Sequence, residues 1–326
     1  METILEAKNI TKSYPGVIAL DDVNFNVYKG KVNVLVGENG AGKSTLMKIL
    51  SGVEKQTSGD ILLNNQKLEI NSTKDAEANS IGIIHQELNL FPNLAVHENI
   101  FMGHELMNKY KTVNVNSQIK ITKDLMKKLN QNIDAKSLLE SLRIGQQQIV
   151  EIAKALAKKT KILIMDEPSS ALSKNEASVL FNVIAELKNQ GVTIIYISHK
   201  LEEIMQIGDV ITILRDSKLI CEELISKIDI PWITEKMVGM KNFEAVNNNK
   251  PTLGKKIIEV KSINLKKNKS DEFILDNISL DSKSGEILSL YGLMGSGRTE
   301  LLEIIMGLNK EFEGSIYLEE KELKYS

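Results

Sequence analysis

A glycine-rich stretch near the N-terminus has the residue types and spacing of a loop that binds phosphate. It consists of Gly37-Glu38-Asn39-Gly40-Ala41-Gly42-Lys43-Ser44-Thr45. Glycines at these intervals let successive backbone N–H groups curl around phosphate oxygens, and a helix that follows adds positive potential at its N-terminus. Lys43 would place its charge on the β- and γ-phosphates of a nucleotide, and the Ser44 hydroxyl can coordinate Mg²⁺. We therefore expect a Mg-ATP site here, with a glycine turn that binds nothing as the weaker alternative.

Two carboxylates and a histidine are candidates for chemistry on that phosphate. Asp166 and Glu167 follow one apolar run, and His199 follows another. At the C-terminal ends of parallel strands, Asp166 would lie beside the phosphate loop and hold Mg²⁺ through its water shell. Glu167 would then act as general base on an attacking water. Taken alone, an acidic pair at a strand end is more often only solvated, and a single histidine there is more often a hydrogen-bonded filler.

The apolar periodicity predicts the elements that must position these groups. We expect strands at residues 32–36, 161–165 and 192–197, one helix beginning at residue 44, and another at residues 175–188. This alternation predicts an α/β fold with a mainly parallel core sheet. Residues 60–64 and 210–214 are expected to be strands of an additional antiparallel part.

The chain carries two copies of one pattern, offset by 255 residues. Residues 20–63 lie over residues 275–318 without a gap. The glycines that coincide are Gly30, Gly37, Gly40, Gly42, Gly52 and Gly59 with Gly285, Gly292, Gly295, Gly297, Gly307 and Gly314. Shared glycines indicate shared backbone geometry. We expect a first domain at residues 1–240, a linker at residues 241–254 and an incomplete second copy at residues 255–326, as in a fragment or a shortened gene product.

Composition narrows the class of protein. The 326 residues, 42% of them hydrophobic, are enough for more than one packed domain. The charges of the 41 basic and 43 acidic residues nearly cancel, so the chain has no overall positive potential that would attract nucleic acid. The single cysteine, Cys221, excludes a disulfide framework within the chain. Apolar runs fall short of the ~20 residues of a membrane helix, so we expect any membrane role to depend on a partner.

The order of motifs along the first copy resembles that of ATP-binding cassette (ABC) nucleotide-binding domains. After the phosphate loop come Ile84-His85-Gln86-Glu87, Leu142-Arg143-Ile144-Gly145-Gln146-Gln147-Gln148, Ile164-Met165-Asp166-Glu167-Pro168 and Ile197-Ser198-His199. The resemblance implies a P-loop NTPase fold with an antiparallel β subdomain and an α-helical subdomain. It also implies that Tyr14 stacks on adenine, that Gln86 contacts Mg²⁺ and senses a membrane partner, and that His199 senses the γ-phosphate.

The resemblance also assigns a signature segment, which grips the γ-phosphate bound by a second cassette. That segment is Leu142, Arg143, Ile144, Gly145 and Gln146. Ser173 stands where many members carry Asp, and two further departures from the family pattern bear on the ATP sites. Arg143 stands where the signature normally has serine, and Arg298 replaces the lysine of the phosphate loop in the second copy, shortly before Glu300.

Both departures would fall on the same composite site, because each ATP of an ABC dimer lies between one copy's phosphate loop and the other copy's signature. The site that contains Lys43 would then need a signature from another cassette. We expect the chain to bind ATP but to hydrolyse it poorly unless another chain supplies that segment.

Further segments narrow the resemblance to importers of the ribose, galactose and xylose type. They are residues 86–94, 98–103, 145–156 and 292–300. This resemblance implies permease subunits as partners at the cytoplasmic face of the cell membrane, an indirect link to a substrate-binding protein, and no nucleic acid. Leu88, Leu90, Phe91 and Leu94 would contact the permease, or would pack the cassette's own helical part. The alternatives are a nucleoside importer, a soluble twin-cassette ATPase and a truncated remnant with little turnover.

Overall fold

The computed structural model describes residues 1–239, 253–267, 272–292 and 295–324 of the chain. It divides into two compact units, Met1–Asn242 and Phe243–Ser326. Most of the predicted linker, residues 241–252, lies outside the described residues. The first unit contains two large apolar clusters, and the second contains a smaller one.

A six-stranded sheet forms the centre of the first unit, in the order β10-β9-β3-β8-β7-β6. Its strands are β3 (Val32–Val36), β6 (Ile81–Ile84), β7 (Ile162–Asp166), β8 (Thr193–Ile197), β9 (Val210–Arg215) and β10 (Lys218–Leu224). All neighbours pair in parallel except β9 and β10. Strands β3 and β8 are buried along their whole length, which explains why their sequences are continuous apolar runs. The prediction of an α/β fold with a mainly parallel core sheet is confirmed.

The assignment of residues 210–214 to the antiparallel part is wrong. These residues form most of β9, which pairs in parallel with β3 and antiparallel only with β10. All five are buried, as expected for a strand that is covered on both faces within a central sheet. By contrast, residues 60–63 belong to a four-stranded antiparallel sheet. It contains β1 (Thr3–Tyr14), β2 (Val17–Tyr28), β4 (Ser58–Leu63) and β5 (Gln66–Leu68).

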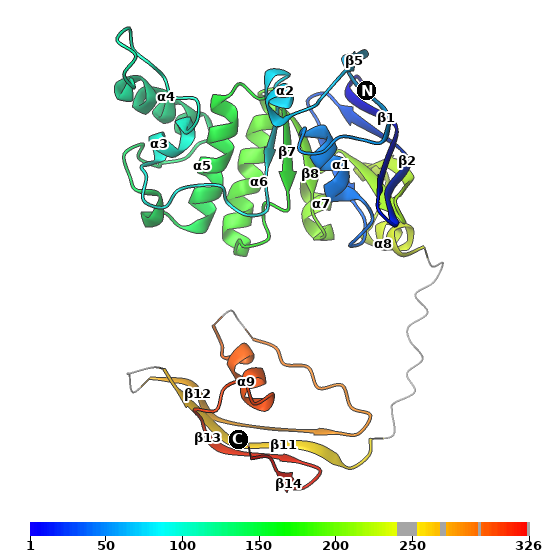
Figure 1. Cartoon of the computed structure of the whole chain (residues 1–326), viewed down its shortest axis with the longest axis vertical. Helices are drawn as coiled ribbons and strands as arrows, with labels where there is room; N and C mark the ends of the chain where they lie inside the picture. The colour runs from blue at the N-terminus through cyan, green and yellow to red at the C-terminus, as the bar shows by residue number, and fades with distance from the viewer. Residues whose placement is uncertain (240–252, 268–271, 293–294, 325–326) are drawn as a thin grey trace. The chain divides into compact units, whose positions relative to one another are not determined.

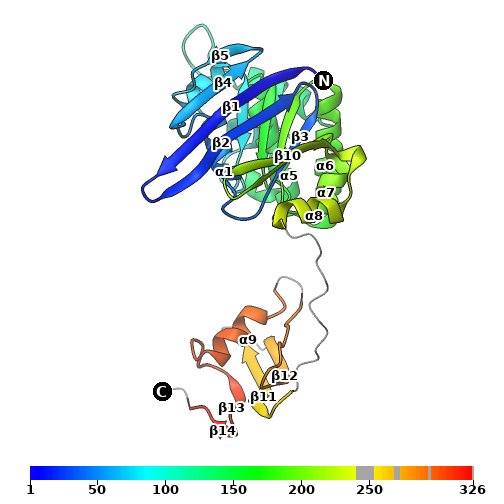
Figure 2. The same ribbon diagram turned by 90° about the vertical axis from the view of Figure 1, so that its right-hand side faces the viewer.

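Helices surround the core sheet of the first unit and extend beyond one side of it (Figure 1). They are α1 (Lys43–Leu50), α2 (Thr73–Ala78), α3 (Val96–Phe101), α4 (Val115–Lys128), α5 (Ile144–Ala157), α6 (Lys174–Asn189), α7 (Leu201–Ile207) and α8 (Ile230–Val238), with 3-10 turns at Leu139–Ser141 and Ile225–Lys227. Helices α3, α4 and α5 pack together on one side of the core sheet (Figure 1). Strands β1 and β2 lie on the opposite side, which faces the viewer in Figure 2. In the described residues, no helix has both the length and the apolar character needed to cross a bilayer.

The second unit repeats the antiparallel sheet of the first. Its strands β11 (Lys256–Lys266), β12 (Phe273–Lys283), β13 (Glu313–Leu318) and β14 (Lys321–Glu322) have the order β12-β11-β13-β14, which matches β2-β1-β4-β5. Helix α9 (Arg298–Ile305) corresponds to α1. Asp22 and Asn277, which the 255-residue offset matches, both have positive φ, at 54° and 51°.

The repeat fails at residues 287–291, which the offset matches to β3. These residues form no strand in the structure, and Ile287 and Tyr291 are 94% and 98% exposed. In the first unit, β3 pairs with β8 and β9. The described part of the second unit holds no strands in the corresponding places, so Ile287 and Tyr291 have no neighbouring strand to pack against.

Candidate nucleotide-binding site

Strand β3 runs into the glycine-rich loop, and α1 begins at Lys43 directly after it. Gly40 and Gly42 have positive φ, at 85° and 99°. A methyl group added to Gly42 would lie 2.5 Å from the carbonyl oxygen of Ala19 and 2.6 Å from Cδ2 of Leu20. Glycine at position 42 therefore adopts the left-handed backbone easily, and it leaves room for strand β2, which approaches closely here.

Replacing Gly42 with alanine should destabilise the first unit by about 2–5 kcal/mol, because left-handed strain and a steric overlap add together. Gly40 is the matched control, since it has a similar φ but no atom within 4 Å of an added methyl group. Gly40→Ala should cost only about 1–2 kcal/mol. Urea unfolding without nucleotide measures both free energies, and equal losses would contradict the role of the close approach.

The ammonium group of Lys43 is held inside the loop. Its Nζ donates hydrogen bonds to the carbonyl oxygens of Gly37, at 2.8 Å, and Glu38, at 3.0 Å. Lys43 is only 9% exposed, and this burial lowers its pKa, while the negative charges of Glu167 and Asp166 raise it. A compact cation is thus positioned where the backbone N–H groups of the loop would surround a phosphate.

Two carboxylates from the core sheet face this loop. Asp166 is the last residue of β7, and Glu167 follows it with a left-handed φ of 47°. Burial is the main cause of the raised pKa of Asp166, and repulsion from Glu167 adds to it. Nδ1 of His199, just beyond β8, lies 3.0 Å from Oε1 of Glu167. An imidazole with its proton on Nδ1 would donate this hydrogen bond and hold the Glu167 carboxylate in place.

A cleft of roughly 620 Å³ brings most of the predicted site residues together, and we refer to it as the nucleotide cleft. Its predicted members are Tyr14, Asn39, Gly40, Gly42, Lys43, Ser44, Thr45, Gln86, Asp166 and Glu167. Gly37 and Ala41 are buried within the loop and do not line the cleft. His199 does not line the cleft, but it reaches it through the hydrogen bond to Glu167.

Sequence reasoning missed four residues that also line the nucleotide cleft. They are Val17, Ile18, Ala19 and Ser217. Val17 and Ile18 are 61% and 55% exposed and follow Tyr14 in the hairpin, so they offer apolar surface beside its ring. The Tyr14 hydroxyl donates to the Glu54 carboxylate, which fixes the ring at the edge of the cleft. In the sequence, the only available signal was that the apolar residues Val17 and Ile18 lie close to Tyr14, whereas Ser217 reaches the cleft only through the fold.

The donor set of the cleft fits Mg²⁺. Ser44, Gln86 and Asp166 supply a hydroxyl, an amide and a carboxylate oxygen, and oxygen is the ligand type that Mg²⁺ prefers. No group of three or more His, Cys, Asp or Glu residues that could hold a metal occurs among the described residues. Mg²⁺ usually takes one or two carboxylates and completes its shell with phosphates and water.

The predicted signature lies at the start of α5 and does not line the nucleotide cleft. Arg143 precedes the helix, is exposed, and donates its backbone N–H to the side chain of Gln146 at 3.1 Å. The backbone N–H of Gly145 donates to Oε1 of Glu176, at 3.3 Å. A methyl group on Gly145 would lie 2.9 Å from Cγ of Glu176, so a larger residue at this position would force the Glu176 side chain to shift.

The second unit contains a loop of the same construction. Gly297 precedes α9 with a φ of 82°, and a methyl group there would lie 2.6 Å from Leu275, the residue matched to Leu20. Arg298 opens the helix and is exposed, with Glu300 in the first turn. Residues 293–294 of this loop lie outside the described part of the chain.

Together, the parallel core sheet, the glycine loop opening α1 and the two carboxylates at the end of β7 define a P-loop ATP-binding cassette. A nucleotide-free ATP-binding cassette from an ABC transporter superposes with a TM-score of 0.63 at 26% identity, over 73% of this chain and 100% of that one. A dimeric post-hydrolysis cassette bound to ADP and phosphate gives a TM-score of 0.57 at 27% identity, over 68% and 99%. The family model described as ABC transporter matches residues 20–170 and 275–326, and the chain belongs to this family.

Curated relatives carry the names of sugar importers. The galactose/methyl galactoside import ATP-binding protein of Clostridium tetani is 44% identical over 98% of this chain and 64% of its own length. The xylose import ATP-binding protein of Thermoanaerobacter pseudethanolicus is 45% identical, over 99% and 65%. The ribose import ATP-binding protein of Clostridium tetani is 44% identical, over 98% and 62%. The chain thus spans slightly less than two thirds of the length of these relatives.

Proposed function

We propose that the chain is the ATP-hydrolysing motor of a monosaccharide importer and that it acts on a separate permease at the cytoplasmic face of the cell membrane. The observation that carries this proposal is the nucleotide cleft, which gathers Lys43, Asp166 and Glu167 around one loop. The similarity to relatives named for galactose, xylose and ribose import supports the substrate class. A substrate-binding protein would deliver the sugar to the permease.

In the proposed reaction, Glu167 takes a proton from a water whose oxygen attacks the γ-phosphorus of ATP, while the bond from phosphorus to the β–γ bridging oxygen breaks. His199 orients Glu167 through the contact at Nδ1. Lys43 exchanges its bonds to the Gly37 and Glu38 carbonyls for phosphate oxygens. Mg²⁺, held by Ser44, Gln86 and Asp166, would offset charge on those oxygens. Tyr14 would stack on adenine at the edge of the cleft.

The experiment for this function is deletion of the gene in the source cell, followed by uptake assays with labelled ribose, galactose and xylose. Uptake of at least one sugar should be lost, and the chain should copurify with the permease of that system. Unchanged uptake of all three sugars together with loss of nucleoside uptake would indicate that the chain serves a nucleoside importer. Copurification with ribosomes instead of a permease would favour the soluble twin-cassette alternative.

The proposed signature has one unusual residue, Arg143, directly before α5. Serine there caps a helix better than arginine and is compact enough to approach a phosphate across a dimer interface. Arg143→Ser should therefore raise the free energy of unfolding by about 1 kcal/mol and increase the fraction of ATP-driven dimer. Thermal unfolding and analytical ultracentrifugation measure these quantities.

Lys136→Ser is the matched control, because Lys136 is an exposed cation in the segment that leads to the signature but does not precede a helix. It should change neither quantity. If Arg143→Ser leaves ATP-driven association and turnover unchanged, Arg143 has no part in a composite site.

A further inference from the structure

A short hairpin between α3 and α4 exposes apolar side chains at the surface of the first unit. An isolated antiparallel bridge joins Met107 to Val113. Tyr110, between them, is 87% exposed, and Met107 is 57% exposed. Val113 and Val115, the first residue of α4, are also exposed. Helix α4 itself lies at the outer edge of the first unit, away from the core sheet (Figure 1). We refer to residues 107–113 as the Tyr110 hairpin.

One asparagine holds the turn of this hairpin in shape. The backbone N–H of Asn108 donates to the carbonyl oxygen of Thr112 at 2.9 Å. Its side-chain Oδ1 accepts hydrogen bonds from the backbone N–H groups of Tyr110, at 2.8 Å, and Thr112, at 3.2 Å. Lys111 closes the turn with a left-handed φ of 58°. The hydroxyl of Tyr110 forms no hydrogen bond within the described residues, so an ordered turn presents a free aromatic side chain at its tip.

The same stretch of chain is strongly basic. Residues 106–123 contain four lysines and no aspartate or glutamate, although acidic residues slightly outnumber basic ones in the chain as a whole. These lysines are Lys109 and Lys111 in the hairpin and Lys120 and Lys123, one turn apart on α4, and all are exposed. In the part of the chain that the structure describes, none of the four forms an ion pair. Their positive charges are therefore not balanced by neighbouring carboxylates.

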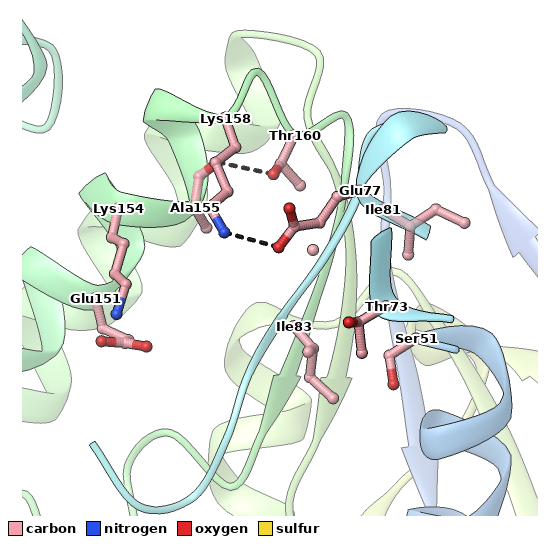
Figure 3. Close-up of a pocket in the computed structure, with 11 residues that line it drawn as sticks. Ser51, Thr73, Glu77, Ile81, Ile83, Glu151, Lys154, Ala155, Lys158 and Thr160 are labelled. Atoms are coloured by element: carbon pink, nitrogen blue, oxygen red, sulfur yellow. Dashed lines mark hydrogen bonds and ion pairs between the residues drawn. The ribbon is translucent and has the colours of Figure 1, made fainter. Parts of the chain in front are cut away.

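The lysines at the end of α5 show the contrast. Nζ of Lys158 lies 2.7 Å from Oε1 of Glu77, in a pocket between α5, β6 and α2 (Figure 3). Lys154 lines the same pocket, and Figure 3 shows it beside the carboxylate of Glu151. Acidic side chains thus accompany the lysines there, whereas the lysines around the Tyr110 hairpin leave a net positive surface.

We propose that the Tyr110 hairpin and the adjoining lysines of α4 bind the headgroup layer of an anionic lipid bilayer. An ammonium group near such a surface strengthens binding by about fivefold, because it is attracted to the lipid phosphates. A tyrosine between two lysines suits this boundary, since its ring can enter the apolar side of the layer while its hydroxyl stays in water. Met107 and Val113 would add apolar contact with the acyl chains.

The composition of the surface favours lipid over a protein or a nucleic acid. Lysine is depleted in protein–protein interfaces, where arginine is enriched, and residues 106–123 contain no arginine. Single-stranded nucleic acid would use the lysines and the ring of Tyr110, but it would leave Met107 and Val113 without a role. Lysines interleaved with exposed apolar side chains are typical of segments that lie in a membrane interface. The inference needs no permease, so it can fail or hold independently of the proposed function.

Flotation of the full chain with lipid vesicles tests the inference. Vesicles made of equal parts of phosphatidylcholine and phosphatidylglycerol should bind the chain, and vesicles of phosphatidylcholine alone should bind it about tenfold more weakly or less. Binding to the mixed vesicles should be lost at about 1 M salt, where the Debye length falls to about 3 Å. Failure of the wild-type chain to bind the mixed vesicles at low salt would overturn the inference.

Paired lysine variants locate the contact. Lys109→Gln combined with Lys111→Gln should weaken binding to the mixed vesicles by about tenfold or more, since two cations are lost. The matched control is Lys174→Gln combined with Lys283→Gln, which removes the same charge at exposed lysines of α6 and β12. The control should bind as the wild-type chain does. Equal binding by the hairpin variant would overturn the inference.

The tip of the hairpin is tested with Tyr110→Trp. The wild-type chain has a single tryptophan, Trp232 on α8, so the added fluorescence of the variant reports on the tip. Brominated lipids in the mixed vesicles should quench this added signal and leave the wild-type signal unchanged. An added signal that resists quenching while the variant is bound would overturn the proposed contact of the tip with the bilayer. Binding to RNA instead of vesicles, with the same loss in the hairpin variant, would overturn the inference in favour of nucleic acid. Sugar uptake, which tests the proposed function, is decided separately.

Discussion

Replacement of Lys43 by alanine is expected to weaken ATP binding to the first unit by about 100-fold or more. The Nζ of Lys43 is fixed by the Gly37 and Glu38 carbonyls and lies within the fields of Asp166 and Glu167. Losing one partner of a buried, charge-assisted contact costs about 2–5 kcal/mol, and about 2.7 kcal/mol corresponds to 100-fold. Titration calorimetry with ATP and Mg²⁺ measures the change, and circular dichroism checks that the variant is folded.

The internal repeat supplies a matched control for this variant. Arg298 occupies the position of Lys43 in the second unit, but it is exposed, and Glu300 follows in the same turn. Arg298→Ala should leave ATP affinity of the chain within about twofold, since most binding would come from the first unit. A loss as large as that of Lys43→Ala would show that the second loop holds nucleotide equally well.

Replacement of Glu167 by glutamine should slow ATP hydrolysis by about 10²–10⁴-fold, the usual contribution of a general base, while ATP affinity stays nearly unchanged. Glutamine retains the size of the side chain but cannot take up the proton of the attacking water. Phosphate release should be measured in a single turnover of the chain assembled with its permease. The contrast with Lys43→Ala separates the two roles, because one variant loses binding and the other loses chemistry.

Glu202→Gln is the matched control, because Glu202 is exposed on α7 and does not line the nucleotide cleft. It should hydrolyse ATP at the wild-type rate. If Glu167→Gln also retains that rate, the general base must be another group, and His199, in contact with Glu167, becomes the first candidate.

The sequence predicts the phosphate loop well because one contiguous segment of the chain determines its geometry. Residues 37–45 carry the glycines and the lysine, and the apolar run before them specifies a buried strand. The carboxylates at 166 and 167 can be predicted for a similar reason, since parallel strands end at the same edge of a sheet. The part of the site that depends on local sequence can thus be predicted from the sequence alone.

The features that sequence reasoning missed depend on long-range pairing. A short apolar run such as residues 210–214 is compatible with a strand of the central sheet and with a strand of the antiparallel sheet. Only its parallel pairing with β3 shows that it belongs to the central sheet. Ser217 reaches the cleft because the turn after β9 lies against the β1–β2 hairpin, where its hydroxyl donates to the Ile18 carbonyl. Glu151 appears in sequence as one polar residue of an amphipathic helix, and its burial follows from the packing of α5 beside β6.

The uncovered stretch at residues 287–291 has a practical consequence for handling the chain. Its sequence, Ile-Leu-Ser-Leu-Tyr, combines strong β-propensity with the absence of charge and proline. Ile287 and Tyr291 are almost fully solvated. An exposed segment of this composition is a predicted site of strand addition from other molecules, so we expect it to favour self-association of the second unit.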